Sequence, residues 1–285
     1  RRQRQMCIRD RGYIIDKADL FAESKMHNIQ FEQYQMLKQF YSLKSSVPKR
    51  IVIDNKFEYF DDLKVDLKNL ELFDTKFEKI SKGRKLDLIK LAKKNAEISL
   101  ENNIQNEKRL AHILQKLKEN LSLSSLPKRI ECFDISNTQG TNPVASMVVF
   151  SNCEPDKSKY RKFKINCKGP NDYEMMKEAI QRRLKRIDQD GWEKPDLILI
   201  DGGKGHLNKI SSLIPKNINV ASIAKPLKKE NIDKIYLPNQ KDSVEFNKDI
   251  EPLNILINLR NEAHRFAITF HKSRRSKDML GQLKT

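Results

Sequence analysis

The chain has 285 residues, of which 38% are hydrophobic and 33% charged, and this composition is typical of a globular protein with a buried core. Its 56 Lys and Arg residues outnumber its 38 Asp and Glu residues, so the net charge is +18. Nucleic acid, an acidic membrane surface and an acidic protein partner are all compatible with that excess. An AT-rich genome also raises the lysine content without any function, so the charge alone does not choose among them.

The sequence excludes several other classes of protein. No run approaches the roughly 20 apolar residues of a membrane span, and no secretory signal opens the chain. The four cysteines lack the C-x-x-C spacing of a zinc site, and a chain of this length needs no disulfide framework. We therefore expect a cytoplasmic protein without membrane contact.

The first part of the chain predicts a small α/β region that ends in a long helix. Residues 1–11 are expected to be a non-native leader, and Gly12 to start partway through a longer natural protein. A Ser and Pro cluster at 122–127 marks a domain boundary, so this first region covers 12–126. The apolar spacing predicts a helix over 28–44, strands at 50–53 and 70–73, and a helix over 83–121.

The second part, residues 127–272, predicts an α/β sheet of mixed direction with helices on its faces. A basic tail, 273–285, follows it. Three strands in a meander come first, and then helix, strand, helix, strand and helix, which is the order of the ribonuclease H-like fold. The expected elements are strands at 130–135, 144–150 and 160–165, a helix over 172–188, a strand at 197–200, a helix over 204–213, a strand at 220–224 and a helix over 251–271.

Two carboxylates and one imidazole are the candidate functional groups. Asp134 lies near the end of the first strand of this sheet, Asp201 follows the unbroken apolar strand 197–200, and His264 lies on the apolar stripe of the last helix. A carboxylate buried among apolar residues is costly unless it is paired or binds a metal ion. Structural alternatives stay open for each: capping of a turn for the two aspartates and a core position for the histidine. Together the three favour a divalent cation site, and the oxygen-rich ligand set favours Mg²⁺ or Mn²⁺ over Zn²⁺.

Further polar residues surround this candidate site. Asp172 opens the helix over 172–188, either as its N-cap or as an additional acidic residue of the site. Basic residues on that helix, after Asp201 and at the chain's end are expected to contact DNA phosphates, with a solvated helix end as the alternative for the last group. They are Arg182, Lys185, Lys204, Arg265, Lys272, Arg274 and Arg275.

Several short segments resemble one known family. Phe133-Asp-Ile-Ser136, Asn171-Asp-Tyr173, Pro195-Asp-Leu-Ile-Leu-Ile-Asp-Gly-Gly-Lys-Gly205 and Glu262-Ala-His-Arg-Phe-Ala267 resemble the C-terminal nuclease half of UvrC, the incision subunit of bacterial nucleotide excision repair. The resemblance is dense over 127–280 and looser upstream, where it fits the family's connecting region. Asn137 departs from it by standing where the family commonly has His, and Lys225-Pro226 alters a stretch that usually reads Lys followed by Gly or Arg.

The resemblance implies a ribonuclease H-like, metal-dependent DNA endonuclease that cuts the damaged strand on the 5′ side of a lesion. Its catalytic set would be Asp134, Asp201 and His264, with Asp172 as a further acidic position. Asp134 and Asp201 would hold the metal, and His264 would ligate it or handle a proton. The implied partners are damaged double-stranded DNA and a UvrB-like protein. The family's N-terminal nuclease domain, its UvrB-contacting segment and its helix-hairpin-helix module have no counterpart in this sequence, so we expect a fragment.

Three other functions remain compatible with the residues. The chain could be a nucleic-acid-binding module without catalysis, which would keep its DNA affinity when Asp201 is replaced. It could be a ribonuclease H-like enzyme of another purpose, which preference for an RNA–DNA hybrid would reveal. It could also be a scaffold that recruits repair partners, which would bind protein but bind DNA weakly.

Overall fold

The computed structural model contains two compact units, residues 1–107 and 108–285. It describes residues 2–10, 13–22, 28–43, 48–69, 75–136, 144–167, 171–226, 232–246 and 250–282, and within these ranges it describes the side chains from 28 to 269 except that of residue 136. Across that part of the chain, no helix combines the length and apolar character needed to cross a membrane.

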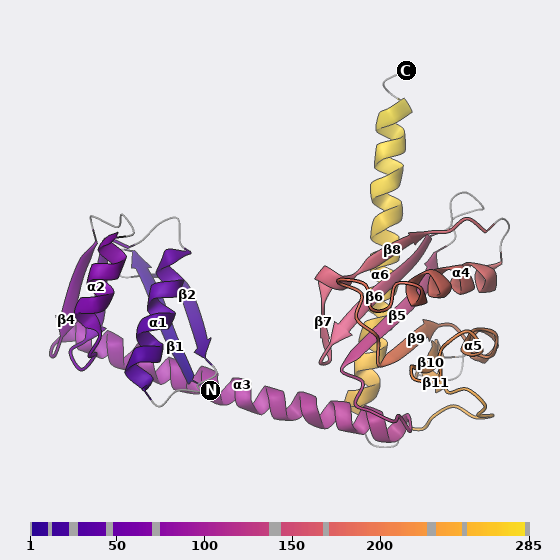
Figure 1. The fold of residues 1–285 in the computed structure, drawn as a ribbon, viewed down its shortest axis with the longest axis horizontal. Helices are drawn as coiled ribbons and strands as arrows, with labels where there is room; N and C mark the ends of the chain where they lie inside the picture. Colours follow the sequence, from indigo (N-terminus) through magenta and orange to yellow (C-terminus); the bar gives the residue numbers. More distant parts are fainter. Residues whose placement is uncertain are drawn as a thin grey trace. The chain divides into compact units, whose positions relative to one another are not determined.

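The first unit combines a β-hairpin with a small α/β layer (Figure 1). Leu37, Ile53, Leu63 and Leu67 are buried in a hydrophobic cluster of the α/β layer. The hairpin consists of β1 (Arg2–Asp10) and β2 (Tyr13–Ala22), which are antiparallel. The other elements are α1 (Ile29–Ser42), β3 (Arg50–Asp54), α2 (Phe60–Asn69), β4 (Lys76–Ile80), which runs parallel to β3, and α3 (Arg84–Asn120).

Sequence reasoning found the helix α1, the strand β3 and the long helix α3, but it missed four elements of the first part: β1, β2, α2 and β4. It set residues 1–11 aside, so it did not foresee the strand at 2–10; the non-native origin of these residues stays a prediction. It also missed α2, which is short, and β4, in which Lys76, Glu78 and Lys79 dilute the apolar signal. The strand expected at 70–73 falls on 70–74, outside the described residues.

The two compact units divide within α3, between residues 107 and 108. The sequence placed a boundary later, after the helix at 122–127. The physical reason for the difference is that the last turns of α3 are apolar and buried: Ile113, Leu114 and Leu117 belong to the core of the second unit. The predicted domain limits stay predictions.

A seven-stranded mixed sheet forms the centre of the second unit, in the order β11-β10-β9-β5-β6-β7, with β8 also paired to β6. The expected meander is present, because β6 pairs antiparallel with both β5 and β8. Strands β9 and β10 then extend the sheet in parallel beyond β5. The strands are β5 (Arg129–Ser136), β6 (Val144–Ser151), β7 (Glu154–Pro155), β8 (Arg161–Lys164), β9 (Leu197–Asp201), β10 (Asn219–Ala224) and β11 (Lys234–Tyr236).

Three α-helices lie against this sheet: α4 (Asp172–Leu184), α5 (Lys204–Ser211) and α6 (Ile250–Gln282). Side chains alternate between the faces of a strand, and β5 shows which helix covers which face. Glu131 binds Arg183 of α4, whereas Ser146, the cross-strand partner of Asp134, binds the backbone of α6 at Ala263. Therefore α4 and α6 cover opposite faces of the sheet (Figure 1).

The last helix is longer than the sequence predicted. The prediction ended it at residue 271, where the apolar stripe stops, but α6 continues to Gln282. Residues 272–280 contain no Pro or Gly that would break a helix. The expected basic tail therefore begins within the helix.

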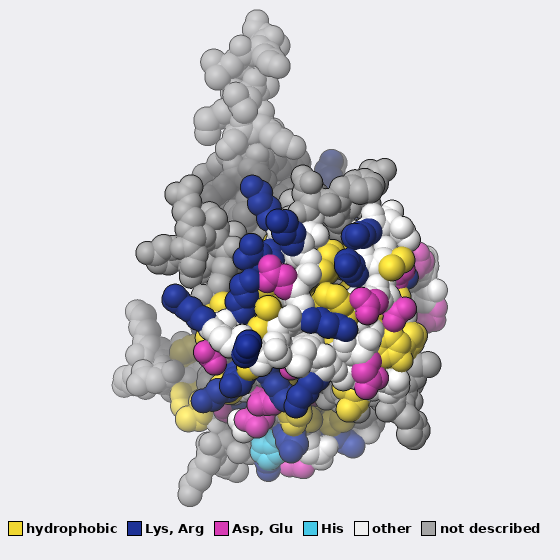
Figure 2. Space-filling model, turned by 90° about the vertical axis from the view of Figure 1, so that its left-hand side faces the viewer, with side chains coloured by type: hydrophobic (Ala, Val, Ile, Leu, Met, Phe, Trp, Pro, Cys, Tyr) yellow, Lys and Arg dark blue, Asp and Glu magenta, His cyan; other side chains and the backbone are white. Residues whose placement is uncertain are grey.

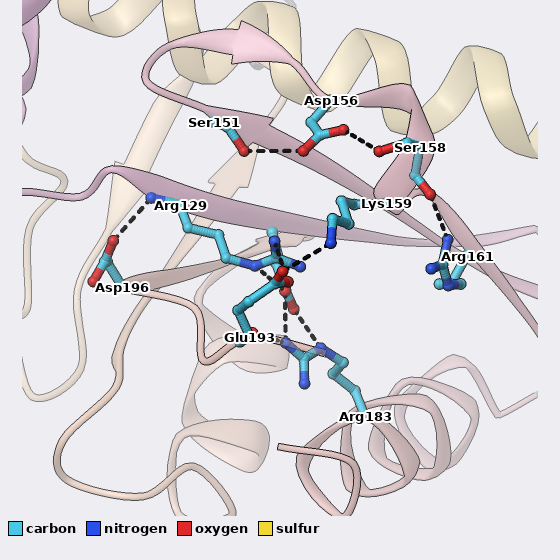
Figure 3. A network of polar contacts seen from close by, with 10 residues as sticks. Arg129, Ser151, Asp156, Ser158, Lys159, Arg161, Arg183, Glu193 and Asp196 are labelled. Atoms are coloured by element: carbon cyan, nitrogen blue, oxygen red, sulfur yellow. Dashed lines mark hydrogen bonds and ion pairs between the residues drawn. The ribbon is translucent and has the colours of Figure 1, made fainter. Parts of the chain in front are cut away.

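A buried ionic network fixes the α4 face of the sheet (Figure 3). The Arg183 guanidinium donates from Nε and Nη2 to the two carboxylate oxygens of Glu131, both at 2.8 Å, and both side chains are fully buried. Arg129 donates from Nε to the same carboxylate at 2.9 Å. Glu193 joins the network by accepting from Arg129 and Lys159. A charge buried in this way keeps its place only as long as its partners remain.

We expect the substitution Arg183→Met to destabilise the second unit by about 3 kcal/mol, because it leaves the Glu131 carboxylate buried with one partner fewer. Urea titration followed by circular dichroism measures this. The exposed neighbour gives the control: Lys185→Met is expected to change stability by less than about 0.5 kcal/mol. Adding Glu131→Gln to Arg183→Met should recover part of the loss, and a double variant less stable than the single one would contradict a charge-based role.

Candidate metal centre

Asp134 and Asp201 lie side by side at the same edge of the sheet. In the parallel pair of β5 and β9, Phe133 is opposite Ile200, so the next residues of the two strands are Asp134 and Asp201. Parallel neighbours point to the same face, which is the face that α6 covers. The burial differs slightly, since Asp134 is buried and Asp201 is half-buried. The strand pairing alone thus places two carboxylates next to each other.

The helix α6 brings His264 to this pair. Its Nδ1 atom lies 3.4 Å from the Asp134 carboxylate oxygen Oδ2, and its side chain is 53% exposed. One possible ligand atom from each of Asp134, Asp201 and His264 lies within 4.8 Å of the others. Within the residues that the structure describes, this is the group of His, Cys, Asp and Glu residues with metal-binding geometry. The three residues that the sequence singled out are therefore together in space.

A buried hydroxyl joins the two elements that supply these ligands. The Ser146 Oγ lies 3.2 Å from the carbonyl of Ala263, the residue before His264, and 3.5 Å from the carbonyl of Asp134. Ser146 itself is fully buried on β6, opposite Asp134. It connects α6 to the strand that holds Asp134, and this connection sets the position of the imidazole. Val144-Ala-Ser146 is also one of the segments that resemble the UvrC family, but sequence reasoning assigned Ser146 no role, because a serine in a strand does not reveal its contacts.

Electrostatics make this site favourable for a cation. Burial raises the pKa of Asp134, although the nearby His264 opposes the shift. Burial, and secondly the charge of Asp134, raise the pKa of Asp201 to about 6. The ionised forms of these two neighbouring carboxylates are unfavourable in the metal-free protein. A divalent cation would neutralise their charge and so stabilise them. Two carboxylates and one imidazole match the hard oxygen ligands, with a single nitrogen, that suit Mg²⁺ or Mn²⁺.

A tight turn follows Asp201 and fixes the end of β9. Gly202 has φ +156°, and a Cβ placed on it would lie 2.9 Å from Cγ of His206. The His206 ring stacks on Tyr173 of α4, with ring centroids 4.3 Å apart. These two aromatic residues close the turn from the side of α4 and α5. Sequence reasoning did not identify the His206 ring that packs against this turn.

Asp172 is not part of the three-residue group. It is the first residue of α4 and is exposed, and the N-cap is its neighbour Asn171, whose Oδ1 accepts from the backbone N–H groups of Tyr173 and Glu174. The expectation that Asp172 caps this helix is therefore wrong by one residue. The stretch holds two adjacent capping-type residues, and the sequence pattern does not decide between them.

Most of the predicted DNA-contacting side chains that the structure describes already bind protein groups. Arg265 donates two hydrogen bonds of 2.6 Å to Glu262, Arg182 contacts Glu178 and the carbonyl of Lys164, and Lys204 donates to the carbonyl of Lys241 at 2.9 Å. Lys185 is exposed. The side chains of Lys272, Arg274 and Arg275 lie outside the described residues. Roles in DNA binding stay predictions for all seven.

The surface charge does not single out a binding face by itself. Figure 2 shows one side of the molecule, on which Lys and Arg side chains are scattered among acidic and hydrophobic ones. On that side, the described Lys and Arg side chains do not form a single patch.

Two family models match the chain. The model of the UvrC RNAse H endonuclease domain matches residues 118–268, which is more than half of the chain and includes all three residues of the candidate metal centre. The model of the UvrC ribonuclease H-like domain matches residues 4–103. The fold is accordingly a ribonuclease H-like α/β fold with a carboxylate-rich edge, which defines a nuclease-type domain. The chain belongs to the UvrC family.

Curated relatives agree with the family models. UvrABC system protein C of Methanosphaera stadtmanae is 39% identical over 251 residues, which are 85% of this chain and 41% of the relative. UvrABC system protein C of Cytophaga hutchinsonii is 43% identical over 208 residues, which are 70% of this chain and 34% of the relative. The chain thus spans between a third and about two fifths of the length of these relatives.

Solved structures of nucleases match more weakly. An endonuclease V of Ciona intestinalis in complex with DNA is 17% identical, with a TM-score of 0.31, over 48% of this chain and 74% of that chain. An endonuclease V of Bacillus subtilis is 13% identical, with a TM-score of 0.31, over 59% of this chain and 94% of that chain. A likeness at this level supports no conclusion about the activity of this protein.

We expect Asp201→Asn to raise the stability of the metal-free protein at pH 7. The pKa of Asp201 is about 6 in the folded protein, whereas its ordinary value is 3.8. Ionisation of this carboxyl group therefore opposes folding increasingly as the pH rises from 3.8 through about 6. The gain should reach about 1–2 kcal/mol, less than the full ~3 kcal/mol of a two-unit shift, because the side chain is partly exposed. Thermal unfolding in EDTA between pH 3.5 and 7 measures this, and the difference should vanish below about pH 4. A gain that does not depend on pH would contradict the electrostatic cause.

We expect Gly202→Ala to destabilise the protein by about 1–3 kcal/mol, because φ +156° is unfavourable for an L residue and the new Cβ would collide with His206. Gly203→Ala is the matched control. Nothing lies within 4 Å of a Cβ at residue 203, so we expect a loss below about 1 kcal/mol, from its N-cap position alone. Chemical denaturation of both variants tests the difference, and equal losses would show that the turn is not strained.

Proposed function

We propose that this chain is a metal-dependent DNA endonuclease that makes the 5′ incision in the damaged strand during nucleotide excision repair. The observation that carries this proposal is the convergence of Asp134, Asp201 and His264 at one edge of a ribonuclease H-like sheet. The family membership supports the repair role. The chemistry of the ligand set supports Mg²⁺ or Mn²⁺ as the metal.

Each of the three residues has a defined part in this reaction. A bound divalent ion supplies stabilisation of negative charge on the phosphate and a lowered pKa for water. Asp134 and Asp201 hold the ion, because their pair of carboxylates is fixed by the pairing of β5 with β9. The Nδ1 atom of His264 points toward Asp134, and about half of its side chain is exposed to solvent. His264 can therefore ligate the ion or accept a proton at the edge of the sheet where the two carboxylates lie. Asp172, on the neighbouring helix, is a candidate for an outer acidic role.

The substrate and partners belong to the proposal as well. Both relatives carry the name UvrABC system protein C, which supports DNA as the substrate and a repair complex as the setting. Damaged double-stranded DNA and a UvrB-like partner are therefore the expected binding partners. The expected cytoplasmic location stays a prediction.

Nicking of supercoiled plasmid DNA in Mn²⁺ tests the proposal. We expect the wild-type chain to convert supercoiled to open-circular DNA and Asp201→Asn to reduce the rate by at least about 100-fold, because one of the charge-bearing groups of the site is lost. Asp190→Asn, at an exposed position of the α4–β9 loop, is the matched control and should retain the wild-type rate.

The other outcomes identify the alternatives. Equal nicking by wild type and Asp201→Asn would refute the assigned site. Absence of nicking in both, combined with Mn²⁺ binding that the substitution abolishes in calorimetry, would mean that the metal centre exists but needs a loading partner. Absence of both nicking and Mn²⁺ binding, with DNA affinity unchanged by the substitution, would favour a non-catalytic binding module.

A further inference from the structure

Lys225 directly follows β10 and lies beside the candidate metal centre. Strands β9 and β10 are parallel, and Ile223 is the partner of Asp201, so both side chains point to the α6 face. Side chains two positions apart along an extended chain point to the same face, and Lys225 is two residues after Ile223. Lys225 therefore lies on the α6 face as well. Its charge acts on both carboxylates, since it lowers the pKa of Asp134 and of Asp201 against the effect of burial. Lys225 is thus a cation at the reacting edge of the sheet.

Lys225 differs from the other cation near the site. Arg260, one helical turn before His264, is buried and binds Asp233 and Asn261, so its charge is already used within the protein. The Lys225 side chain is exposed. Among the residues that the structure describes, no hydrogen bond or ion pair involves its ammonium group. It can therefore reach an anion that approaches Asp134 and Asp201 from solvent.

We propose that Lys225 is a further catalytic residue, whose ammonium group donates hydrogen bonds to a non-bridging oxygen of the phosphate that is cut. This inference rests on the proposed nuclease function. Its geometric basis is the position of Lys225 at the end of β10, on the same face as both carboxylates. An ammonium group there offsets the negative charge that two aspartates present to an incoming phosphodiester.

The role of Lys225 in the reaction is electrostatic. During hydrolysis, an oxygen of water forms a bond to phosphorus, and the bond from phosphorus to the 3′ oxygen breaks. The water loses one proton, and the departing 3′ oxygen gains one. Lys225 transfers neither proton. It stabilises the charge that builds on the non-bridging oxygens in the transition state, and such stabilisation acts on the rate of the chemical step more than on binding.

The first test measures binding rather than cutting. The affinity for a short DNA duplex is measured by fluorescence anisotropy across a series of salt concentrations, in Ca²⁺ and under conditions in which no strand is cut. We expect Lys225→Met to reduce the slope of log affinity against log salt by about 1, because one phosphate contact is lost. Lys225→Arg should keep the wild-type slope.

The matched control is Lys216→Met. Lys216 is exposed just before β10, whereas Lys225 directly follows the end of the same strand. Both substitutions remove one positive charge from the second unit. Only the one beside the carboxylates is expected to change the slope.

The second test measures nicking in Mn²⁺. We expect Lys225→Met to lower kcat by about 100-fold with a KM within a few-fold of the wild type, because the lost contact stabilises the transition state. Lys225→Arg should recover part of the rate, since it restores the charge with a different geometry. Lys216→Met should cut at the wild-type rate.

Each result has a defined meaning. An unchanged salt slope in Lys225→Met overturns the proposed contact. A reduced slope with an unchanged kcat also overturns it, because the contact would then be to a phosphate other than the one that is cut. If neither the wild-type chain nor Asp201→Asn nicks DNA, the calorimetric measurement of Mn²⁺ binding decides between a missing loading partner and failure of the proposed function. The salt slope then decides whether Lys225 binds a phosphate.

Discussion

The burial of two adjacent carboxylates is the constraint on which the rest of the site depends. Asp134 and Asp201 are held next to each other by the backbone pairing of β5 with β9, so they cannot move apart to relieve their repulsion. Burial raises the pKa of both. A protein tolerates such an arrangement only if other groups compensate, and here His264, Lys225 and Arg260 do so in part. A divalent cation between the carboxylates would complete the compensation, so the electrostatic cost of the metal-free site would favour the binding of such an ion.

Strand β5 takes part in both the metal centre and the buried ionic network. Along β5, Glu131 points toward α4 and Asp134 toward α6, so a single extended segment supplies an acidic group to each face. On the α4 face, Arg183 and Arg129 neutralise the carboxylate with fixed partners. On the α6 face, the side chain that contacts the Asp134 carboxylate, among the residues that the structure describes, is the half-exposed imidazole of His264. The same residue type is therefore structural on one side of the strand and chemically available on the other, and the number of permanent partners makes the difference.

Local pattern was enough to predict most of the sheet and the three central residues. Strand β9 is an unbroken apolar run that ends in Asp201. Along β5, Ile130, Cys132 and Asp134 share one face. The carboxylates at the ends of these two strands could therefore be predicted from the sequence. The length of α6, the helix α2 and the strand β4 could not, because charged residues obscure their periodicity. The roles of Ser146 and His206 were equally invisible, since each depends on a contact between elements far apart in the chain. The sequence pattern thus predicts functional side chains at the end of a strand, but it does not predict the tertiary contacts that orient them.

The basic character of the chain gains meaning only when each cation is considered with its partners. A net charge of +18 attracts any polyanion, and it does so without selecting a site. Arg182, Arg183, Arg260 and Arg265 all bind carboxylates of the protein, so the arginines near the sheet mainly hold its structure. Lys225 lies beside two carboxylates whose pKa values are raised by burial, and at Asp201 also by the charge of Asp134. Lys225 is exposed and its charge acts on both carboxylates, which is why we propose this cation, rather than the more numerous charges elsewhere on the surface, as the one that acts on a bound phosphate.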